Sequence, residues 1–434
     1  MPDHAPVPND ARPLNILWLK SGPLHPPNTG GRKRTYHMVK ELRKLHHVTY
    51  LALDAGDGQG FSPAETAEYC QELVRVPFRE TPKGTPAFYL ELLRNALASN
   101  LPYVLERYRS PELTRRLTGL TARPCDLLVC DFLTPALNLP RPSPVPTLLF
   151  QHNVEAAIWR RMVENAGHPF AKIYLGAQHR RMVRHETELS RQFDGVVAVS
   201  EDDATQFRQV YGLSNVLGAV PTGVDLDFFN PANPANGSAQ AQAANARTVA
   251  FLGSMDWLPN IDAVQYYAAG AWDQVLAACP DAKFLVIGRN PPAKLHDLAA
   301  RAAGNSIRLT GTVDDVRPHL AGCAAMVVPL TIGGGTRIKI YEAMALGVPV
   351  ISTTIGAEGL PVRHGEHLLI ADDPAALAAA TRQLLENPAQ GRELAASALR
   401  LVRENFGWEA ITREFETLCR QAIAAGQKRL ATSG

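Results

Sequence analysis

The sequence has no long apolar run, no paired cysteines and almost no net charge. None of its apolar stretches approaches the ~18 residues that a membrane-spanning helix needs. The first 13 residues are polar and proline-rich, without the basic start and apolar core of a secretory signal, so secretion is not expected. Six cysteines are scattered with no Cys-x-x-Cys pair, which favours reduced core thiols in a cytoplasmic protein over a disulfide framework or a zinc site. A net charge of +2 gives no support for nucleic acid as a partner.

What the sequence does contain is a repeated alternation of apolar strands and amphipathic helices. The 434 residues suffice for two or three domains, and 46% hydrophobic against 20% charged residues is typical of a globular protein. The alternation indicates βαβ units and parallel sheets, in one series from residue 15 and a second from residue 248. We therefore predict an α/β protein with two Rossmann-like domains facing a cleft. The expected strands are 15–20, 48–53, 126–130, 147–151, 195–200 and 215–221, then 248–253, 283–287, 307–310, 324–329, 348–352 and 368–370.

Two further segments stand out by composition. The tract 230–247 is rich in turn-forming and small residues, so we expect a mobile surface linker there. Residues 170–192 are expected to form a long helix that carries Arg180, Arg181 and Arg184. One interpretation of these cations is a solvated face. The other is peripheral contact with anionic lipid headgroups or with a polyprenyl diphosphate acceptor.

The most informative segment runs from Pro329 to Ser352. A buried strand ends in three glycines, and a helix then begins with two cations and a carboxylate. Backbone N–H groups, the positive helix start and the cations together predict a diphosphate site, while the carboxylate three residues after the second cation can accept hydrogen bonds from sugar hydroxyls. The alternative is an ordinary glycine-rich turn with solvated charges. The residues assigned to a nucleotide diphosphate and its ribose are Gly333, Gly334, Gly335, Thr336, Arg337, Lys339 and Glu342.

This segment resembles the donor-site segment of family 4 glycosyltransferases. These are enzymes of the GT-B fold that transfer a sugar from a nucleotide diphosphate with retention at the anomeric carbon. The resemblance extends from Asn15 to about Leu418 and is strongest from Val249 to Gly359. Many members carry two glutamates separated by seven residues here. In this chain the second is Glu342 and the first position is Gly334, which leaves backbone amides in place of a carboxylate.

The resemblance implies a domain organisation. It predicts an acceptor-side domain over 14–222, a nucleotide-sugar donor domain over 223–404, and a C-terminal helix and tail over 405–434. In relatives this last helix crosses back onto the first domain, and the segment 408–426 is expected to do the same. The alternative is an ordinary terminal helix of the second domain.

Three more positions in the second half resemble the family. Gly253 follows a strand, where ligand loops of open α/β sheets lie. Many members place an Arg or Lys in this loop; none is present here, so charge neutralisation is assigned mainly to Arg337 and Lys339. Arg289 ends the next strand and could reach the base or ribose, with surface solvation as the alternative. Val313 matches the residue that packs against the base, with a simple αβ turn as the alternative.

A glycine loop and a histidine in the first half are expected to lie in the active site. Gly30, Gly31 and Arg32 follow the first strand and open a helix, which again favours anion binding. They resemble the family's N-terminal loop, which approaches the donor phosphate and the acceptor, while a solvated helix turn is the alternative. His152 ends a strand, matches a family histidine close to the transferred sugar, and is expected to stabilise charge there through its ring or its backbone carbonyl.

No metal site is predicted. Asp202-Asp203 and Asp314-Asp315 have no neighbouring ligands, so capping or solvation is the better interpretation. Ser200 in particular is expected to cap the helix that contains Asp203. Arg337 and Lys339 can supply the charge that a divalent ion would otherwise provide, and the nucleotide sugar is a co-substrate, so no cofactor is expected either.

The resemblance implies a retaining glycosyltransferase of cell-envelope or exopolysaccharide biosynthesis, with a glycan, lipid-linked or small-molecule acceptor. His152, Arg337 and Lys339 would be its catalytic residues, with the cations stabilising the departing diphosphate. Two alternatives stay open. One is a nucleotide-sugar epimerase or hydrolase on the same fold. The other is a non-catalytic nucleotide-binding protein, which the missing first glutamate motivates.

Overall fold

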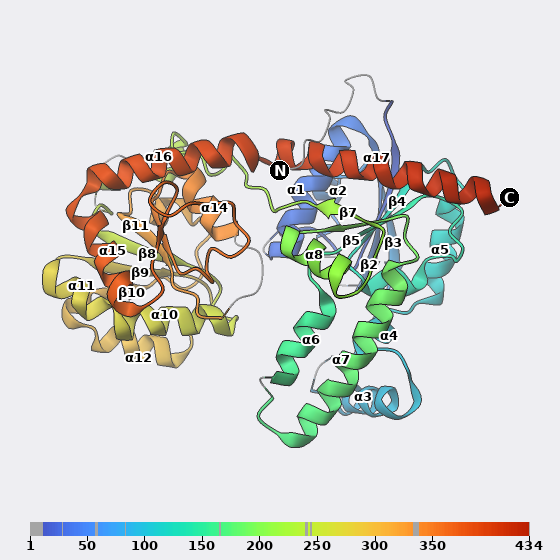
Figure 1. Ribbon diagram of the computed structural model, residues 1–434, viewed down its shortest axis with the longest axis horizontal. Coiled ribbons are helices and arrows are strands. Elements are labelled where there is room, and N and C mark those ends of the chain that lie inside the picture. Colours follow the sequence, from blue (N-terminus) through green and yellow to red (C-terminus); the bar gives the residue numbers. More distant parts are fainter. Residues whose placement is uncertain are drawn as a thin grey trace. The chain divides into compact units, whose positions relative to one another are not determined.

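The computed structural model describes residues 12–27, 29–56, 60–82, 84–164, 166–238, 242–243, 245–332 and 338–433. The chain divides into two α/β units (Figure 1). The first unit runs to Pro221 and takes in Ile411–Gly434, and the second unit is Thr222–Ala410.

The first unit is built on a seven-stranded parallel sheet in the order β3-β2-β1-β4-β5-β6-β7. The central strands are buried along most of their length because helices cover both faces, as expected for a parallel sheet. The strands are β1 (Asn15–Lys20), β2 (His47–Asp54), β3 (Glu72–Pro77), β4 (Leu127–Asp131), β5 (Thr147–Phe150), β6 (Gly195–Ala198) and β7 (Val216–Ala219).

The helices of this unit begin where the sequence provides caps. Helix α1 (Gly30–Leu45) starts after Thr29, whose side chain accepts from the N–H of Arg32. Ser200 caps α8 (Glu201–Gln209) by accepting from the N–H of Asp203 at 3.1 Å, as predicted. The other helices are α2 (Pro63–Thr66), α3 (Pro86–Ala98), α4 (Tyr103–Arg107), α5 (Pro111–Thr121), the short η1 (Thr134–Asn138), α6 (Glu155–Glu164) and α7 (Pro169–Ser190).

The second unit has a six-stranded parallel sheet in the order β10-β9-β8-β11-β12-β13. Its strands are β8 (Thr248–Leu252), β9 (Lys283–Ile287), β10 (Ile307–Leu309), β11 (Ala325–Val328), β12 (Val350–Ser352) and β13 (Leu369–Ile370). Its helices are η2 (Pro234–Asn236), α10 (Leu258–Gly270), α11 (Trp272–Ala278), α12 (Ala293–Arg301), η3 (Ala303–Asn305), α13 (Arg317–Leu320), α14 (Ile338–Ala345), α15 (Pro374–Glu386) and α16 (Pro388–Asn405).

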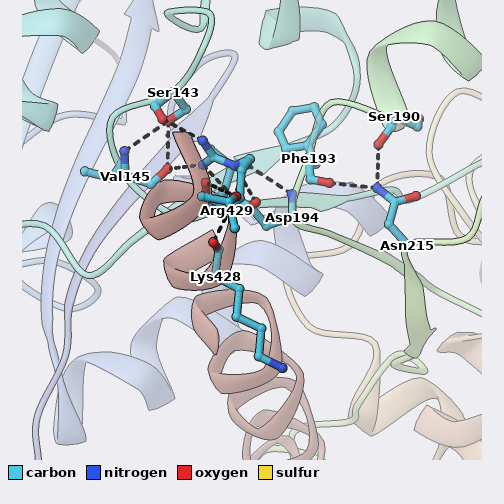
Figure 2. Close-up of polar contacts among 10 residues, drawn as sticks. Ser143, Val145, Ser190, Phe193, Asp194, Asn215, Lys428 and Arg429 are labelled. Atoms are coloured by element: carbon cyan, nitrogen blue, oxygen red, sulfur yellow. Dashed lines mark hydrogen bonds and ion pairs between the residues drawn. The ribbon is translucent and has the colours of Figure 1, made fainter. Parts of the chain in front are cut away.

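The last helix, α17 (Trp408–Ser433), belongs to the first unit from Ile411 onward. Its Phe415 packs against Phe150 at 4.9 Å and Trp18 at 5.7 Å between ring centroids. Near its end, Arg429 Nε lies 2.7 Å from Asp194 Oδ1, and its guanidinium also donates to two backbone carbonyls (Figure 2). These contacts fix the helix on the sheet of the first unit, which is the crossing that the family resemblance predicts.

The tract 230–247 was expected to be a mobile linker, but its described residues make specific side-chain contacts. Asn236 is 1% exposed, and its side-chain amide donates to the carbonyls of Asn230 and Pro231. Asn245 donates to the carbonyl of Ala321 at 2.8 Å. Amide side chains thus satisfy backbone carbonyls that a free linker would leave to water.

Candidate functional site

In the second unit the strand order reverses between β8 and β11. Ligands of open α/β sheets bind outside the carboxyl ends of the strands at such a switch point. Gly253 follows β8 directly, and α14 begins ten residues after β11 ends. The segment between β11 and α14 includes Gly333, Gly334, Gly335, Thr336 and Arg337, which lie outside the described residues.

Lys339 lies against the loop that follows β8. Its Nζ donates to Asn260 Oδ1 at 2.9 Å and lies 4.6 Å from the centre of the Phe251 ring. A Cβ added to Gly253 would lie 2.9 Å from the same Nζ and 2.8 Å from Asn260 Nδ2. Asn260 in turn donates to the carbonyl of Ser254 at 2.8 Å. The amine of Lys339 is thus held at the carboxyl end of β8, where a diphosphate would need its charge neutralised.

Glu342 lies one turn further along α14, with only 6% of the residue exposed. Its spacing of three residues from Lys339 places both side chains on neighbouring positions of one helix face. Glu342 has a partner within the chain, and the sequence predicts that its carboxylate also accepts from the ribose hydroxyls.

Three glycines mark the ends of neighbouring strands. A Cβ on Gly288 would lie 1.9 Å from the carbonyl oxygen of Gly253, so the loops after β8 and β9 touch and only glycine fits there. Gly288 also bridges Gly311, after β10. Val313, two residues further on, is half-buried beside this edge.

Arg289 is engaged by the loop that follows β8. Its Nε lies 2.7 Å from Asp256 Oδ2 and donates to Ser254 Oγ at 3.0 Å. The side chain is 42% exposed and carries its own carboxylate partner. Contact with a base or ribose would therefore have to compete with the Asp256 ion pair.

In the first unit the strand order reverses between β1 and β4, and the last residues of these strands are paired. Lys20 Nζ lies 2.9 Å from Asp131 Oδ2. The same oxygen accepts from Thr35 Oγ1 at 2.6 Å and from Trp18 Nε1 at 3.0 Å. Burial alone would raise the pKa of Asp131, but the charge of Lys20 and the contacts of His152 and Thr35 hold that pKa below its ordinary value. Asp131 is therefore a buried carboxylate that organises the switch point.

His152, which follows β5, completes this network. Its Nε2 lies 2.8 Å from Asp131 Oδ1, and its ring packs on Phe132 at 4.0 Å between centroids. Burial lowers the pKa of His152 to about 3, against the opposing pull of Asp131, so the imidazole is neutral near pH 7. Neither ring nitrogen has an aligned hydrogen-bond partner among the described residues. A proton on Nε2, the nitrogen nearer the carboxylate, leaves the lone pair on Nδ1. A Cβ on Gly31 would lie 3.8 Å from this Nδ1, which places the free lone pair at the start of α1.

The start of α1 carries buried positive charge. Arg34 is 1% exposed, and its Nε and Nη1 have no hydrogen-bond partner among the described residues. Burial lowers its pKa to about 9, against the opposing effect of the Asp131 and Asp203 charges, which leaves it protonated at neutral pH. Lys20, which pairs with the buried Asp131, and Arg34 are thus two buried cations in the same region of the first unit. Gly30 is the first residue of the helix that carries Arg34. This arrangement favours an anion at the predicted loop.

Arg32 faces a neighbouring cavity of about 330 Å³ at the same sheet edge. Three aromatic residues contribute to its wall, Phe61, Phe78 and Tyr108, and the last two rings stack at 5.3 Å. Aromatic faces with a few polar groups are typical of small-molecule sites. The first unit thus offers a pocket beside the predicted acceptor loop.

Sequence reasoning missed Lys20, Thr35, Asp131 and Asn260. Each becomes part of a site only through partners at least 15 residues away in the chain. The sequence does contain a clue for Lys20 and Asp131, because each is a charged residue at the end of an apolar strand. Among the described residues, no group of three or more His, Cys, Asp or Glu side chains is arranged to hold a metal ion. In the same part of the chain, no helix combines the length and the apolar character needed to cross a membrane.

Comparison with known proteins shows which family this chain resembles. The description "Glycosyltransferase Family 4" matches residues 29–228, and "Glycosyl transferases group 1" matches residues 246–387. A phosphatidyl-myo-inositol mannosyltransferase of Mycobacterium tuberculosis is 30% identical over 242 residues, which cover 54% of this chain and 61% of that protein. A 44.6 kDa protein in the cps region of Klebsiella pneumoniae is 23% identical over 265 residues, covering 60% of this chain and 64% of that protein. These matches span a little under two thirds of the relatives' length.

Solved structures show the same fold. Sucrose-phosphate synthase from Thermosynechococcus elongatus superposes with a TM-score of 0.69 at 19% identity, covering 95% of this chain and 100% of that one. HepE from Anabaena, in complex with UDP and glucose, gives a TM-score of 0.63 at 17% identity, covering 93% and 98%. The fold is GT-B, as predicted. With the two family matches, the chain belongs to family 4 of the glycosyltransferases.

Proposed function

We propose that this chain is a retaining glycosyltransferase that moves a sugar from a nucleotide-diphosphate sugar to a lipid-linked or glycan acceptor of the cell envelope. The observation that carries the proposal is the amine of Lys339, held 2.9 Å from Asn260 against the glycine that ends β8. A cation fixed at a switch point, beside strand ends that only glycine fits, is suited to a diphosphate.

The second unit binds the donor in this proposal. Lys339 and Arg337 neutralise the diphosphate, Glu342 accepts from the ribose, and backbone amides of 333–336 contact phosphate or sugar. Gly253 leaves room for the Lys339 amine, and Val313 packs against the base. The nucleotide sugar is a co-substrate, so the proposal needs neither a cofactor nor a metal.

Bond breaking follows from this charge arrangement. As the bond between the anomeric carbon and the diphosphate oxygen breaks, its electron pair moves onto the diphosphate. The Lys339 amine, which Asn260 already holds in place, stabilises that charge without reorganisation. The acceptor oxygen then forms its bond on the same face of the sugar, and its proton passes to the leaving phosphate oxygen. Retention results without a carboxylate nucleophile.

The first unit binds the acceptor in this proposal. His152 is uncharged near pH 7, so its Nδ1 lone pair accepts a hydrogen bond from a sugar hydroxyl at the start of α1. Arg32 and the amides of Gly30 and Gly31 contact an anionic group of the acceptor or donor.

The names of relatives suggest which substrates to try. Several are phosphatidylinositol mannosyltransferases, and one in Corynebacterium glutamicum is named as GDP-mannose-dependent. Structural neighbours were solved with UDP or UDP-glucose. A lipid acceptor and a donor of mannose or glucose are therefore the first combination to test.

The test is an assay of nucleotide release and product formation. GDP-mannose and UDP-glucose are each incubated with the protein, with and without membrane lipid extract as acceptor. Acceptor-dependent release with a labelled α-linked glycolipid supports the proposal. Acceptor-independent consumption of the donor would instead indicate a hydrolase or epimerase. Nucleotide binding without turnover of any donor would indicate a non-catalytic protein.

A further inference from the structure

Helix α3 exposes a stripe of large apolar side chains while it buries a polar one. Among its residues, all of which the structure describes, only the polar Asn95 is buried. Four large apolar side chains of the same helix are exposed: Tyr89 60%, Leu90 66%, Leu93 55% and Leu97 80%. At about 100° per residue these four lie within one arc of about 100°, opposite Asn95. We call them the α3 stripe.

Polar contacts hold the stripe outward. Asn95 Oδ1 accepts from Gln178 Nε2 at 2.8 Å, and Asn95 Nδ2 donates to the carbonyl of Leu101 at 3.1 Å. Arg181 of α7 donates to the carbonyls of Asn95 and Ala96, both at 3.1 Å. Because this face of α3 is tied to α7, the helix cannot rotate its apolar side inward without breaking several hydrogen bonds. The exposure of the stripe is therefore built into the fold.

More exposed apolar side chains lie on the neighbouring hairpin. Helices α6 and α7 form a hairpin that projects from the sheet of the first unit, and α3 lies beside α7 (Figure 1). Phe170 and Ile173, in the first turns of α7, are 77% and 70% exposed, and Ile158 and Met162 of α6 are also exposed. Eight of the fifteen large hydrophobic side chains exposed in the described part of the chain lie on these three helices. Such a concentration marks an interaction surface.

The charge of this surface identifies its partner. Helices α3, α6 and α7 expose six cations and only two carboxylates, Glu164 and Glu188, which pair with Arg160 and Arg184. A second copy of the same surface would place cations opposite cations, which disfavours a symmetric dimer. An anionic bilayer satisfies both features, since it accepts apolar side chains at headgroup level and attracts basic residues. The exposed cations are Arg94, Arg160, Arg161, Lys172, Arg180 and Arg184.

We propose that α3 and the α6–α7 hairpin form a docking surface for an anionic lipid bilayer. The α3 stripe and the apolar start of α7 enter the headgroup region, and the cations contact lipid phosphates. The cations of the 170–192 segment then act together with α3, because Arg181 holds α3 in place while Lys172 and Arg180 face outward. This inference goes beyond the proposed sugar transfer and does not depend on it.

The test is cosedimentation with phosphatidylcholine vesicles, with and without phosphatidylglycerol. One double variant replaces Leu93 and Leu97 with Glu, and a second replaces Phe170 and Ile173 with Glu. Val210→Glu is the matched control, since Val210 is 71% exposed beyond the end of α8. We expect each double variant to lose about tenfold or more in partitioning to anionic vesicles, and the control to bind like the wild type. Removing phosphatidylglycerol should weaken wild-type binding several-fold.

All of the replaced side chains are more than half exposed, so the variants should keep the wild-type thermal midpoint. Equal vesicle binding by the variants and the wild type would overturn the proposal, as would no wild-type binding. A wild-type dimer that both double variants dissociate, without vesicle binding, would assign the surface to self-association instead. No nucleotide or acceptor is present, so these outcomes are independent of whether the protein transfers a sugar.

Discussion

The amine of Lys339 lies 2.9 Å from the side-chain oxygen of Asn260, and the backbone of Gly253 passes beside both. Asn260 fixes the cation from one side, and the missing Cβ of Gly253 leaves it the space it occupies. The position of the Lys339 amine on α14 is therefore set by Asn260 on α10 and by Gly253 directly after β8.

Replacing Lys339 with Met should lower turnover by about 10²–10³-fold, because a preorganised cation at the leaving group is lost. The free energy of unfolding should change by only about 1 kcal/mol, since Met keeps the apolar stem and the change removes the hydrogen bond to Asn260 and the contact of the charge with the Phe251 ring. Steady-state kinetics and thermal unfolding measure the two effects. Lys294→Met, at an exposed position of α12, is the control and should behave like the wild type. Equal turnover in both variants would remove Lys339 from the mechanism.

A Gly253→Ala substitution should weaken nucleotide-diphosphate binding. The new methyl group would lie 2.9 Å from Lys339 Nζ, and the flexible lysine would move away more readily than the backbone. We expect about a tenfold rise in the dissociation constant, measured by calorimetry, with little change in thermal stability. Gly119→Ala serves as the control because open space surrounds that glycine on α5. Undiminished binding by the Gly253 variant would show that the lysine position is not critical.

His152 should make the first unit sensitive to acid. Its pKa is about 3 in the folded chain and near 6.5 when unfolded, so between these values the unfolded state binds the extra proton. Stability therefore falls as pH drops below about 6.5, by at most about 1.4 kcal/mol per unit. Denaturant unfolding of wild type and His152→Gln is compared from pH 7 to pH 4.5. The stability advantage of the wild type, measured as the free energy of unfolding, should shrink as the pH falls. Parallel curves would contradict the buried neutral imidazole.

Arg429→Ala should destabilise the first unit by about 1–3 kcal/mol, because the buried Asp194 loses its cationic partner. The same guanidinium also donates to the carbonyls of Ser143 and Val145 (Figure 2). Lys428→Ala, at the exposed neighbouring position, is the control and should change stability by less than about 0.5 kcal/mol. Identical midpoints for the two variants would mean that the end of α17 contributes little to the unit.

Much of the fold could be predicted from periodicity. All of the expected strands occur within about two residues of their predicted ends, because parallel strands buried on both faces read as continuous apolar runs. The strand β3 was not foreseen. It lies at the sheet edge with only one of its six residues buried, so its sequence Glu-Leu-Val-Arg-Val-Pro lacks such a run.

The site was less accessible to sequence reasoning. His152 and Lys339 could be predicted as site residues because each follows a strand or opens a helix at a recognisable position. Their partners Asp131 and Asn260 lie 21 and 79 residues away, and only the folded sheet edges bring them together. The protonation state of His152 also depends on burial, which a sequence does not display. Arg289 was expected at the nucleotide, and its pairing with Asp256 follows from loop contacts that spacing does not reveal.

The most direct test of the central claim, a nucleotide-diphosphate site in the second unit, is a calorimetric titration with UDP, GDP and ADP. Wild type, Lys339→Met, Glu342→Gln and the control Lys294→Met are compared. The account predicts that one of these nucleotides binds the wild type and the control with a micromolar dissociation constant, and that both site variants bind it at least about tenfold more weakly. Absence of binding by the wild type, or equal binding by all four proteins, would contradict it.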